Sequence, residues 1–138
     1  MKTENPSYNI YVMGNPLIEE DSLPLRLVPR LRKAFPRISF IEIDPTENFP
    51  EEDPLLIVDT ILHAPGVVMW NDVDAIRSSP TYSLHDFDLG MTLKLMRKMG
   101  TLHRVIVFGL PPQGDEGLIF GELEKAISNS LRESASHN

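Results

Sequence analysis

Residues 55–60 read Leu-Leu-Ile-Val-Asp-Thr, a short apolar run that ends in an acidic and a polar residue. An apolar run without polar alternation is typical of a β-strand that is covered on both faces, as in a parallel sheet. We therefore predict a strand over Leu55–Val58 that ends at Asp59. Such a strand belongs in the middle layer of an α/β domain.

The segments on either side supply the other elements of the domain. Residue type and alternation predict further strands, over Tyr8–Met13, Ile38–Ile43, Val67–Trp70 and Arg104–Phe108. Apolar spacing of three and four predicts helices, over Leu23–Phe35, Leu84–Met99 and Leu118–Leu131. Ser83 is placed to cap the second helix and Gly100 to end it.

This order of elements predicts a five-stranded, mostly parallel sheet with helices on both faces, a three-layer sandwich. Val67–Trp70 follows the preceding strand too closely for a crossover helix, so we expect it to run antiparallel. Pro24 suits the first turn of its helix, whereas Pro29 should kink that helix or delay its regular part. We expect a single domain over residues 1–138, with frayed ends at 1–7 and 133–138.

Composition excludes several classes of function. The net charge of −7 argues against a diffuse basic surface for nucleic acid or an anionic membrane. The chain has no cysteine, which rules out disulfides, a thiol nucleophile and thiolate metal ligands. Neither an apolar signal core nor a run of membrane-spanning length is present, and we expect a cytoplasmic protein.

Four residues with reactive side chains are predicted to gather at one edge of the sheet. Asp21 follows the first strand, Asp44 ends the second and Asp59 ends the third. His85 lies at the start of a helix, and such segments often border the same edge. Ligands of open parallel sheets bind beyond the carboxyl ends of the strands, which makes this edge the candidate site.

His85 has a physical reason to stay neutral. It would be the second residue of its helix, where the positive end of the helix dipole disfavours an imidazolium ion. A neutral imidazole together with the carboxylates of Asp21 and Asp59 forms an O,O,N set that suits a divalent metal ion. Without a metal, the same groups could polarise a water molecule.

Each of these residues also has an ordinary structural interpretation. Asp21 could cap the helix that begins near Leu23, and Asp59 could bond to the backbone of its own loop. A histidine at a helix start is usually structural or solvent-exposed. The sequence contains no GxSxG, HExxH or Walker motif that would favour another catalytic class.

Four segments, in order along the chain, resemble the hydrogenase maturation protease family. The first is Gly14-Asn15-Pro16-Leu17-Ile18-Glu19-Glu20-Asp21, similar to the family's Gly-Asn after a strand followed by an acid. The second is Leu55–Thr60, and the third is Ser83-Leu84-His85-Asp86, which is similar to the family's Ser/Thr-x-His. The fourth is the last strand with its following proline, residues 104–111.

The resemblance implies a phosphorylase/hydrolase-like fold and an aspartic-type endopeptidase. It would trim the C-terminus of the precursor of a nickel–iron hydrogenase large subunit. Asp21, Asp59 and His85 would contact nickel carried by that substrate, so no tightly bound resident cofactor is expected. A carboxylate would act as the base, and Asp44 could assist. We expect a monomer, although no sequence feature determines the oligomeric state.

Two other functions stay open. The family's Asp-Gly-Gly after the second strand is Asp44-Pro45-Thr46 here. The loss of the two glycines makes a non-catalytic, metal-sensing maturation factor an alternative to the protease. The other alternative is an unrelated small-ligand domain of the α/β hydrolase type, in which the acidic edge has no shared role.

Overall fold

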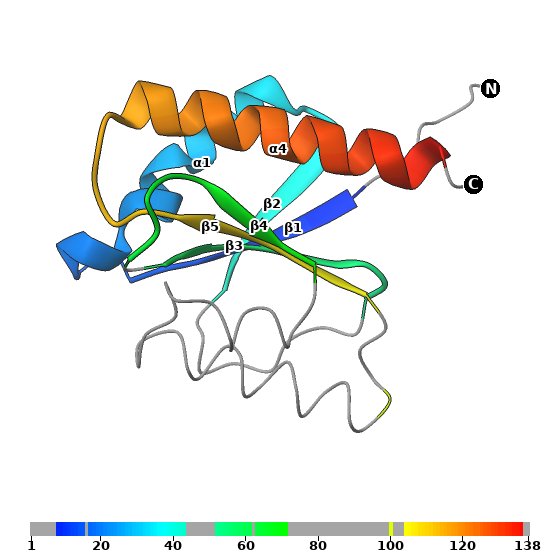
Figure 1. The fold of residues 1–138 in the computed structure, drawn as a ribbon, viewed down its shortest axis with the longest axis horizontal. Helices are drawn as coiled ribbons and strands as arrows, with labels where there is room; N and C mark the ends of the chain where they lie inside the picture. The colour runs from blue at the N-terminus through cyan, green and yellow to red at the C-terminus, as the bar shows by residue number, and fades with distance from the viewer. Residues whose placement is uncertain are drawn as a thin grey trace.

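The structure is a computed structural model that describes residues 8–15, 17–43, 52–61, 63–71, 100 and 104–136. Asp44, His85 and the helix expected over Leu84–Met99 lie outside these ranges, as do residues 1–7. The described part contains one sheet, a short 3₁₀ turn and two long helices (Figure 1).

The sheet has five strands, in the spatial order β2-β1-β3-β5-β4. The strands are β1 (Tyr8–Met13), β2 (Ile38–Ile43), β3 (Leu55–Thr60), β4 (Val68–Trp70) and β5 (Val105–Leu110). The ladders β1–β2, β1–β3 and β3–β5 are parallel, and β4 runs antiparallel to β5. The predicted mixed sheet and its antiparallel strand are therefore confirmed.

Two strands continue further than the sequence pattern predicts. The β3–β5 ladder pairs Asp59 with Gly109 and Thr60 with Leu110, beyond the apolar residues that define each strand. A polar residue or a glycine resembles a strand end in the sequence. Here the backbone ladder continues regardless of these side chains, because its hydrogen bonds join main-chain groups.

Helix α1 (Leu23–Ala34) follows the 3₁₀ turn η1 (Glu19–Asp21) and buries one face. Leu23, Leu27 and Leu31 on that face are fully buried, and each contributes about 1.5–3 kcal/mol to the hydrophobic stabilisation. Pro29 lies within the helix on its exposed side. The helix already begins at Leu23, so the expectation that Pro29 delays its regular part is wrong.

Helix α4 (Glu116–Ser136) is longer than the predicted Leu118–Leu131. At its start, the carboxylate of Asp115 accepts a hydrogen bond of 3.0 Å from the backbone N–H of Leu118, which is an N-cap interaction. At its end, the helix continues through polar residues that carry no apolar pattern. Within the described ranges, no helix is long and apolar enough to cross a membrane.

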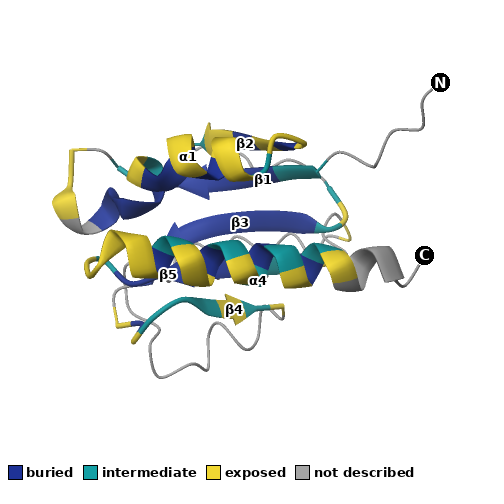
Figure 2. Ribbon diagram, turned by 90° about the horizontal axis from the view of Figure 1, so that it is seen from above, coloured by how far each residue is buried: buried dark blue, intermediate teal, exposed yellow. Residues whose placement is uncertain are grey.

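Both described helices cover the same face of the sheet (Figure 1). There, Ile119, Leu123 and Ile127 of α4 join the α1 leucines and the strands in one buried cluster. The opposite face carries a second cluster, which includes Leu55 and Ile57. Strand β3 is consequently buried along its whole length (Figure 2), as its apolar sequence predicts and as a middle layer requires.

Candidate active site at the carboxyl edge of the sheet

A compact turn after β1 places Asp21 at the carboxyl edge. The backbone N–H of Asn15 donates to the carbonyl of Asp21 at 2.9 Å, and the N–H of Leu17 donates to the side-chain oxygen of Asn15, also at 2.9 Å. Side-chain bonds of this kind from asparagine stabilise tight turns. The two hydrogen bonds of Asn15 therefore close a loop that brings Asp21 back to the carboxyl end of β1.

Gly14 permits this closure. A Cβ atom on residue 14 would lie 2.7 Å from the carbonyl oxygen of Asp21 and 3.2 Å from Cγ of Leu25. Only a residue without a side chain lets the backbone of the Asp21 segment approach so closely. Gly14 and Asn15 together thus hold the loop that carries Asp21 against the end of β1.

Asp21 is the last residue of η1 and is 8% exposed. Its own N–H donates to the carbonyl of Ile18 at 2.9 Å. The N-cap residue of α1 is Ser22. The ordinary interpretation, in which Asp21 serves as the helix cap, is therefore not the arrangement that the structure adopts.

Asp59 is the penultimate residue of β3 and is 5% exposed. Its Oδ1 accepts a hydrogen bond of 2.8 Å from the backbone N–H of Thr60. The strand that was expected to end at Asp59 continues to Thr60, and this bond to a backbone N–H is the kind that the ordinary interpretation of Asp59 predicts. A strand holds its side chains in fixed directions, which is the requirement for a catalytic or metal-binding carboxylate.

Gly109 is the neighbour of Asp59 on β5, and it too is constrained by packing. A Cβ atom at this position would collide with the side chain of Ile61 and lie 2.9 Å from that of Val68. The chain after β3 therefore crosses directly against residue 109. A glycine on the adjacent strand thus accommodates the segment that follows Asp59.

The structure brings Asp21 and Asp59 to the same edge of the sheet. Strands β1 and β3 are parallel neighbours with Val12 opposite Val58, so their carboxyl ends lie together. Both carboxylates are buried at this edge, where oxygen ligands for a cation or a base for water could act. The two other predicted site residues, Asp44 and His85, lie outside the described residues.

The described ranges contain only part of the predicted metal site. The described residues contain no group of three histidine, cysteine, aspartate or glutamate side chains that could hold a metal ion. Asp21 and Asp59 can supply two oxygen ligands. The expected nitrogen ligand, His85, is among the residues that the structure does not describe.

Comparison with known proteins identifies the family. A sequence profile described as hydrogenase maturation protease matches residues 43–137, more than half of the chain. The chain belongs to the hydrogenase maturation protease family. Asp44, Asp59 and His85 lie within the matched range, whereas Asp21 precedes it. A comparison with curated proteins finds no match.

Solved structures of maturation endopeptidases have the same fold. The hydrogenase maturating endopeptidase HybD from E. coli aligns with a TM-score of 0.69 at 16% identity, covering 94% of each chain. An endopeptidase from Escherichia coli solved in solution gives 0.66 at 18% identity, over 91% of this chain and 93% of that one. A hydrogenase 2 maturation peptidase from a Thaumarchaeota archaeon gives 0.60 at 18%, over 91% and 98%.

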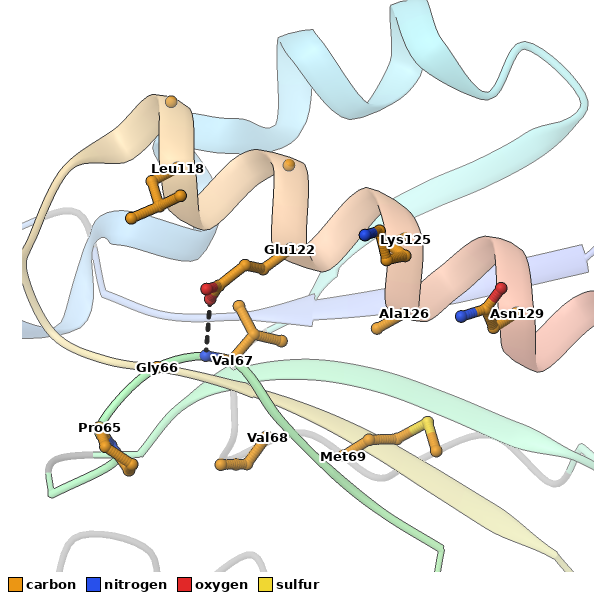
Figure 3. A pocket seen from close by; sticks show the side chains of 12 residues that line it. Pro65, Gly66, Val67, Val68, Met69, Leu118, Glu122, Lys125, Ala126 and Asn129 are labelled. Atoms are coloured by element: carbon orange, nitrogen blue, oxygen red, sulfur yellow. Dashed lines mark hydrogen bonds between the residues drawn. The ribbon is translucent and has the colours of Figure 1, made fainter.

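The protein also has a large open groove, which lies away from the carboxylates of Asp21 and Asp59. It has a volume of about 810 Å³ and lies between residues 65–69 and α4 (Figure 3). The N–H of Val67 donates to Glu122 at 3.3 Å across it, and Met69 is 44% exposed at its floor. None of the predicted site residues lines this groove, and no motif in the sequence indicates it.

A second polar cluster lies at the amino edge of the sheet. The hydroxyl of Tyr11 and the side-chain amide of Asn9 both donate to Oε2 of Glu52. Burial and the acceptor Glu52, with its negative charge, raise the pKa of Tyr11 to about 12. Glu52 was unremarkable in the sequence because its partners lie 43 and 41 positions away.

Proposed function

We propose that the chain is an aspartic-type endopeptidase that removes a C-terminal peptide from a nickel–iron hydrogenase large-subunit precursor. The observation that carries this proposal is the pair of buried carboxylates, Asp21 and Asp59, at one edge of the sheet in a member of this family. Gly14 and Gly109 pack closely against the segments that carry the two carboxylates, which supports a fixed position for both side chains.

In the proposed mechanism, Asp21, Asp59 and His85 contact nickel that the substrate carries. Oxygen and imidazole ligands suit such an ion, and the expected place of His85 at a helix start favours its neutral form. Binding the ion would fix the adjacent peptide bond against the edge of the sheet. Nickel is then a recognition element of the substrate, and the protease needs no resident cofactor.

Peptide hydrolysis at this edge would use water and a carboxylate. A carboxylate takes a proton from water as the oxygen attacks the scissile carbonyl, and the proton passes to the departing amine. Asp21 or Asp59 could be this base, with Asp44 assisting. The absence of cysteine from the chain supports an aspartate-based mechanism over a thiol-based one.

The test is incubation of the purified protein with nickel-loaded precursor, followed by mass spectrometry. The wild type should release one defined C-terminal peptide, and nickel-free precursor should be left uncut. Asp21→Asn and Asp59→Asn should each lower the rate by about 100-fold or more, the usual contribution of a general base. Asp53→Asn is the matched control, because Asp53 is a half-exposed partner of Arg104.

Other outcomes point to the alternatives. A precursor that is bound but never cut would indicate a non-catalytic maturation factor, which the Asp44-Pro45-Thr46 segment makes a specific candidate. Neither binding nor cleavage would favour a domain with an unrelated ligand. Cleavage that survives both asparagine substitutions at full rate would refute the assignment of the site.

A further inference from the structure

We infer that Arg26 is a positioning residue for Asp21, joining the loop that carries this carboxylate to the start of α4. The inference rests on the proposed function, because it gives Arg26 a task at the same site. Arg26 itself is not expected to touch the substrate. It acts through Ser22, the residue next to Asp21.

The loop that carries Asp21 needs support from outside. Turn η1 is only three residues long, and the bond from the N–H of Ser22 to the carbonyl of Glu19 is long, at 3.3 Å. Short 3₁₀ turns have poor hydrogen-bond geometry and seldom hold a shape alone. On the strand side, the support is the bond from Asn15 to the carbonyl of Asp21.

On the helix side, the support is a chain of three polar groups. The guanidinium of Arg26 donates through Nη1 to the hydroxyl of Ser22, and that hydroxyl donates to the carbonyl of Glu19 at 3.0 Å. Ser22 is buried, and its hydroxyl is engaged both as acceptor and as donor. The first residue of η1 is thereby linked, through the residue that follows the turn, to one guanidinium group.

Arg26 is in turn held from α4. Its Nε donates to Oε2 of Glu116 at 3.1 Å, across 90 positions of sequence. Glu116 is the first residue of α4, where the helix dipole favours a negative charge. Both α4 and η1 begin at the same end of the sheet, which lets one arginine reach both (Figure 1).

The planar fork of arginine is needed for this arrangement. Nη1 and Nε point in different directions from one rigid group, whereas lysine presents a single ammonium on a flexible stem. The side chains of Arg26 and Glu116 are 41% and 46% exposed, so their ion pair contributes little to stability. A change at Arg26 should therefore affect the position of Asp21 far more than the folding of the domain.

The experiment measures two independent properties of Arg26→Gln. Amide hydrogen exchange should be about tenfold faster at Asp21 and Asn15, whose N–H groups hold this turn, and unchanged at Ile61 beyond β3. Cleavage of the precursor should lose between about 5-fold and 100-fold in kcat with KM unchanged, as expected for a displaced catalytic group. Arg26→Lys should restore part of both properties.

Matched variants separate positioning from a general loss of charge. Glu116→Gln weakens the same network from the other helix and should produce both effects at a smaller size, which also keeps the test valid if Arg26→Gln folds poorly. Arg104→Gln removes a comparable surface ion pair, the one with Asp53 at 2.9 Å, and should change neither property.

The two readouts also separate this inference from the proposed function. If the wild type fails to cut the precursor, the proposed function fails, and local exchange at Asp21 still decides whether Arg26 positions that residue. Unchanged exchange at Asp21 and Asn15 in both Arg26→Gln and Glu116→Gln would overturn the inference. So would a wild-type kcat in these variants.

Discussion

The two edges of the parallel sheet hold their acidic side chains in different ways. At the amino edge, Glu52 accepts hydrogen bonds from Tyr11 and Asn9, and Asp53 pairs with Arg104. At the carboxyl edge, Asp21 and Asp59 are buried in segments that approach glycine residues closely. The arrangement at the amino edge ties loops to strands. The arrangement at the carboxyl edge fixes two carboxylates at the ends of neighbouring strands, where sheets of this kind bind ligands.

This difference separates acids with a structural role from candidate functional acids. The carboxylate of Glu52, which accepts from two side chains of β1, ties its own segment to the sheet and stabilises the fold. A carboxylate whose segment is shaped by close glycine packing is held for its position. Substitution of the acids at the amino edge should accordingly lower stability, and substitution of the acids at the carboxyl edge should lower activity.

The largest changes in activity and stability are expected when a carboxylate is neutralised, at one edge in each variant. Asp59→Asn should lower precursor cleavage by about 100-fold or more while unfolding stays nearly unchanged. Glu52→Gln should leave cleavage intact and lower stability by about 1–3 kcal/mol, because it weakens charge-assisted hydrogen bonds. Cleavage rates and urea unfolding measure the two effects. A loss of stability in Asp59→Asn together with a loss of cleavage in Glu52→Gln would contradict the distinction between the two edges.

Glycine substitution tests the close packing at the carboxyl edge against an open position in α4. Gly109→Ala should cost about 1–3 kcal/mol, because the new methyl group meets the side chains of Ile61 and Val68. The control is Gly121→Ala in α4, where a Cβ atom meets nothing within 4 Å. That change should stabilise the protein by about 0.5–1 kcal/mol through helix propensity. Equal effects at the two glycines in thermal unfolding would contradict the packing argument.

The amino edge should be sensitive to high pH. The pKa of Tyr11 is raised to about 12 in the folded protein, whereas in the unfolded chain the phenol ionises near pH 10. The unfolded state therefore binds fewer protons between pH 10 and about 12, and stability falls as the pH rises through this window. Tyr11→Phe should lose less stability there; parallel curves for the two proteins would exclude Tyr11 as the cause.

The smallest effect is expected beside Asp59. The hydroxyl of Thr60 is buried and, among the described residues, has no hydrogen-bond partner. Thr60→Val keeps the shape and removes this polar group, so it should stabilise the protein by about 1 kcal/mol. Thr60→Ser is the control: it keeps the hydroxyl, loses a methyl group and should be destabilised. A less stable valine variant would show that the hydroxyl is satisfied in solution.

The sequence predicts most of the described fold because its strands carry strong local patterns. Tyr8–Met13 and Ile38–Ile43 match β1 and β2 in both bounds. The ends of β3 and β5 were missed because Asp59 and Gly109 look like strand terminators, although the ladder between them continues. The end of α4 was missed because its last residues carry no apolar pattern to mark them as helical.

The candidate site is predictable only in part. The rule that parallel strands end together was enough to bring Asp21 and Asp59 to one edge. The contacts of Arg26 with Glu116 and of Tyr11 with Glu52 join residues 90 and 41 positions apart, and no local pattern announces such pairs. The roles of Asp21, Asp44, Asp59 and His85, recognition of nickel, the cytoplasmic location and the monomeric state stay predictions.

A crystal structure of the protein soaked in nickel tests the proposed site most directly. We expect one ion at the carboxyl edge, bound by Asp21, Asp59 and His85 at ligand distances of about 2 Å. An ion bound elsewhere would contradict it. So would carboxylates of Asp21 and Asp59 that lie more than about 8 Å from the imidazole of His85, too far to share one ion.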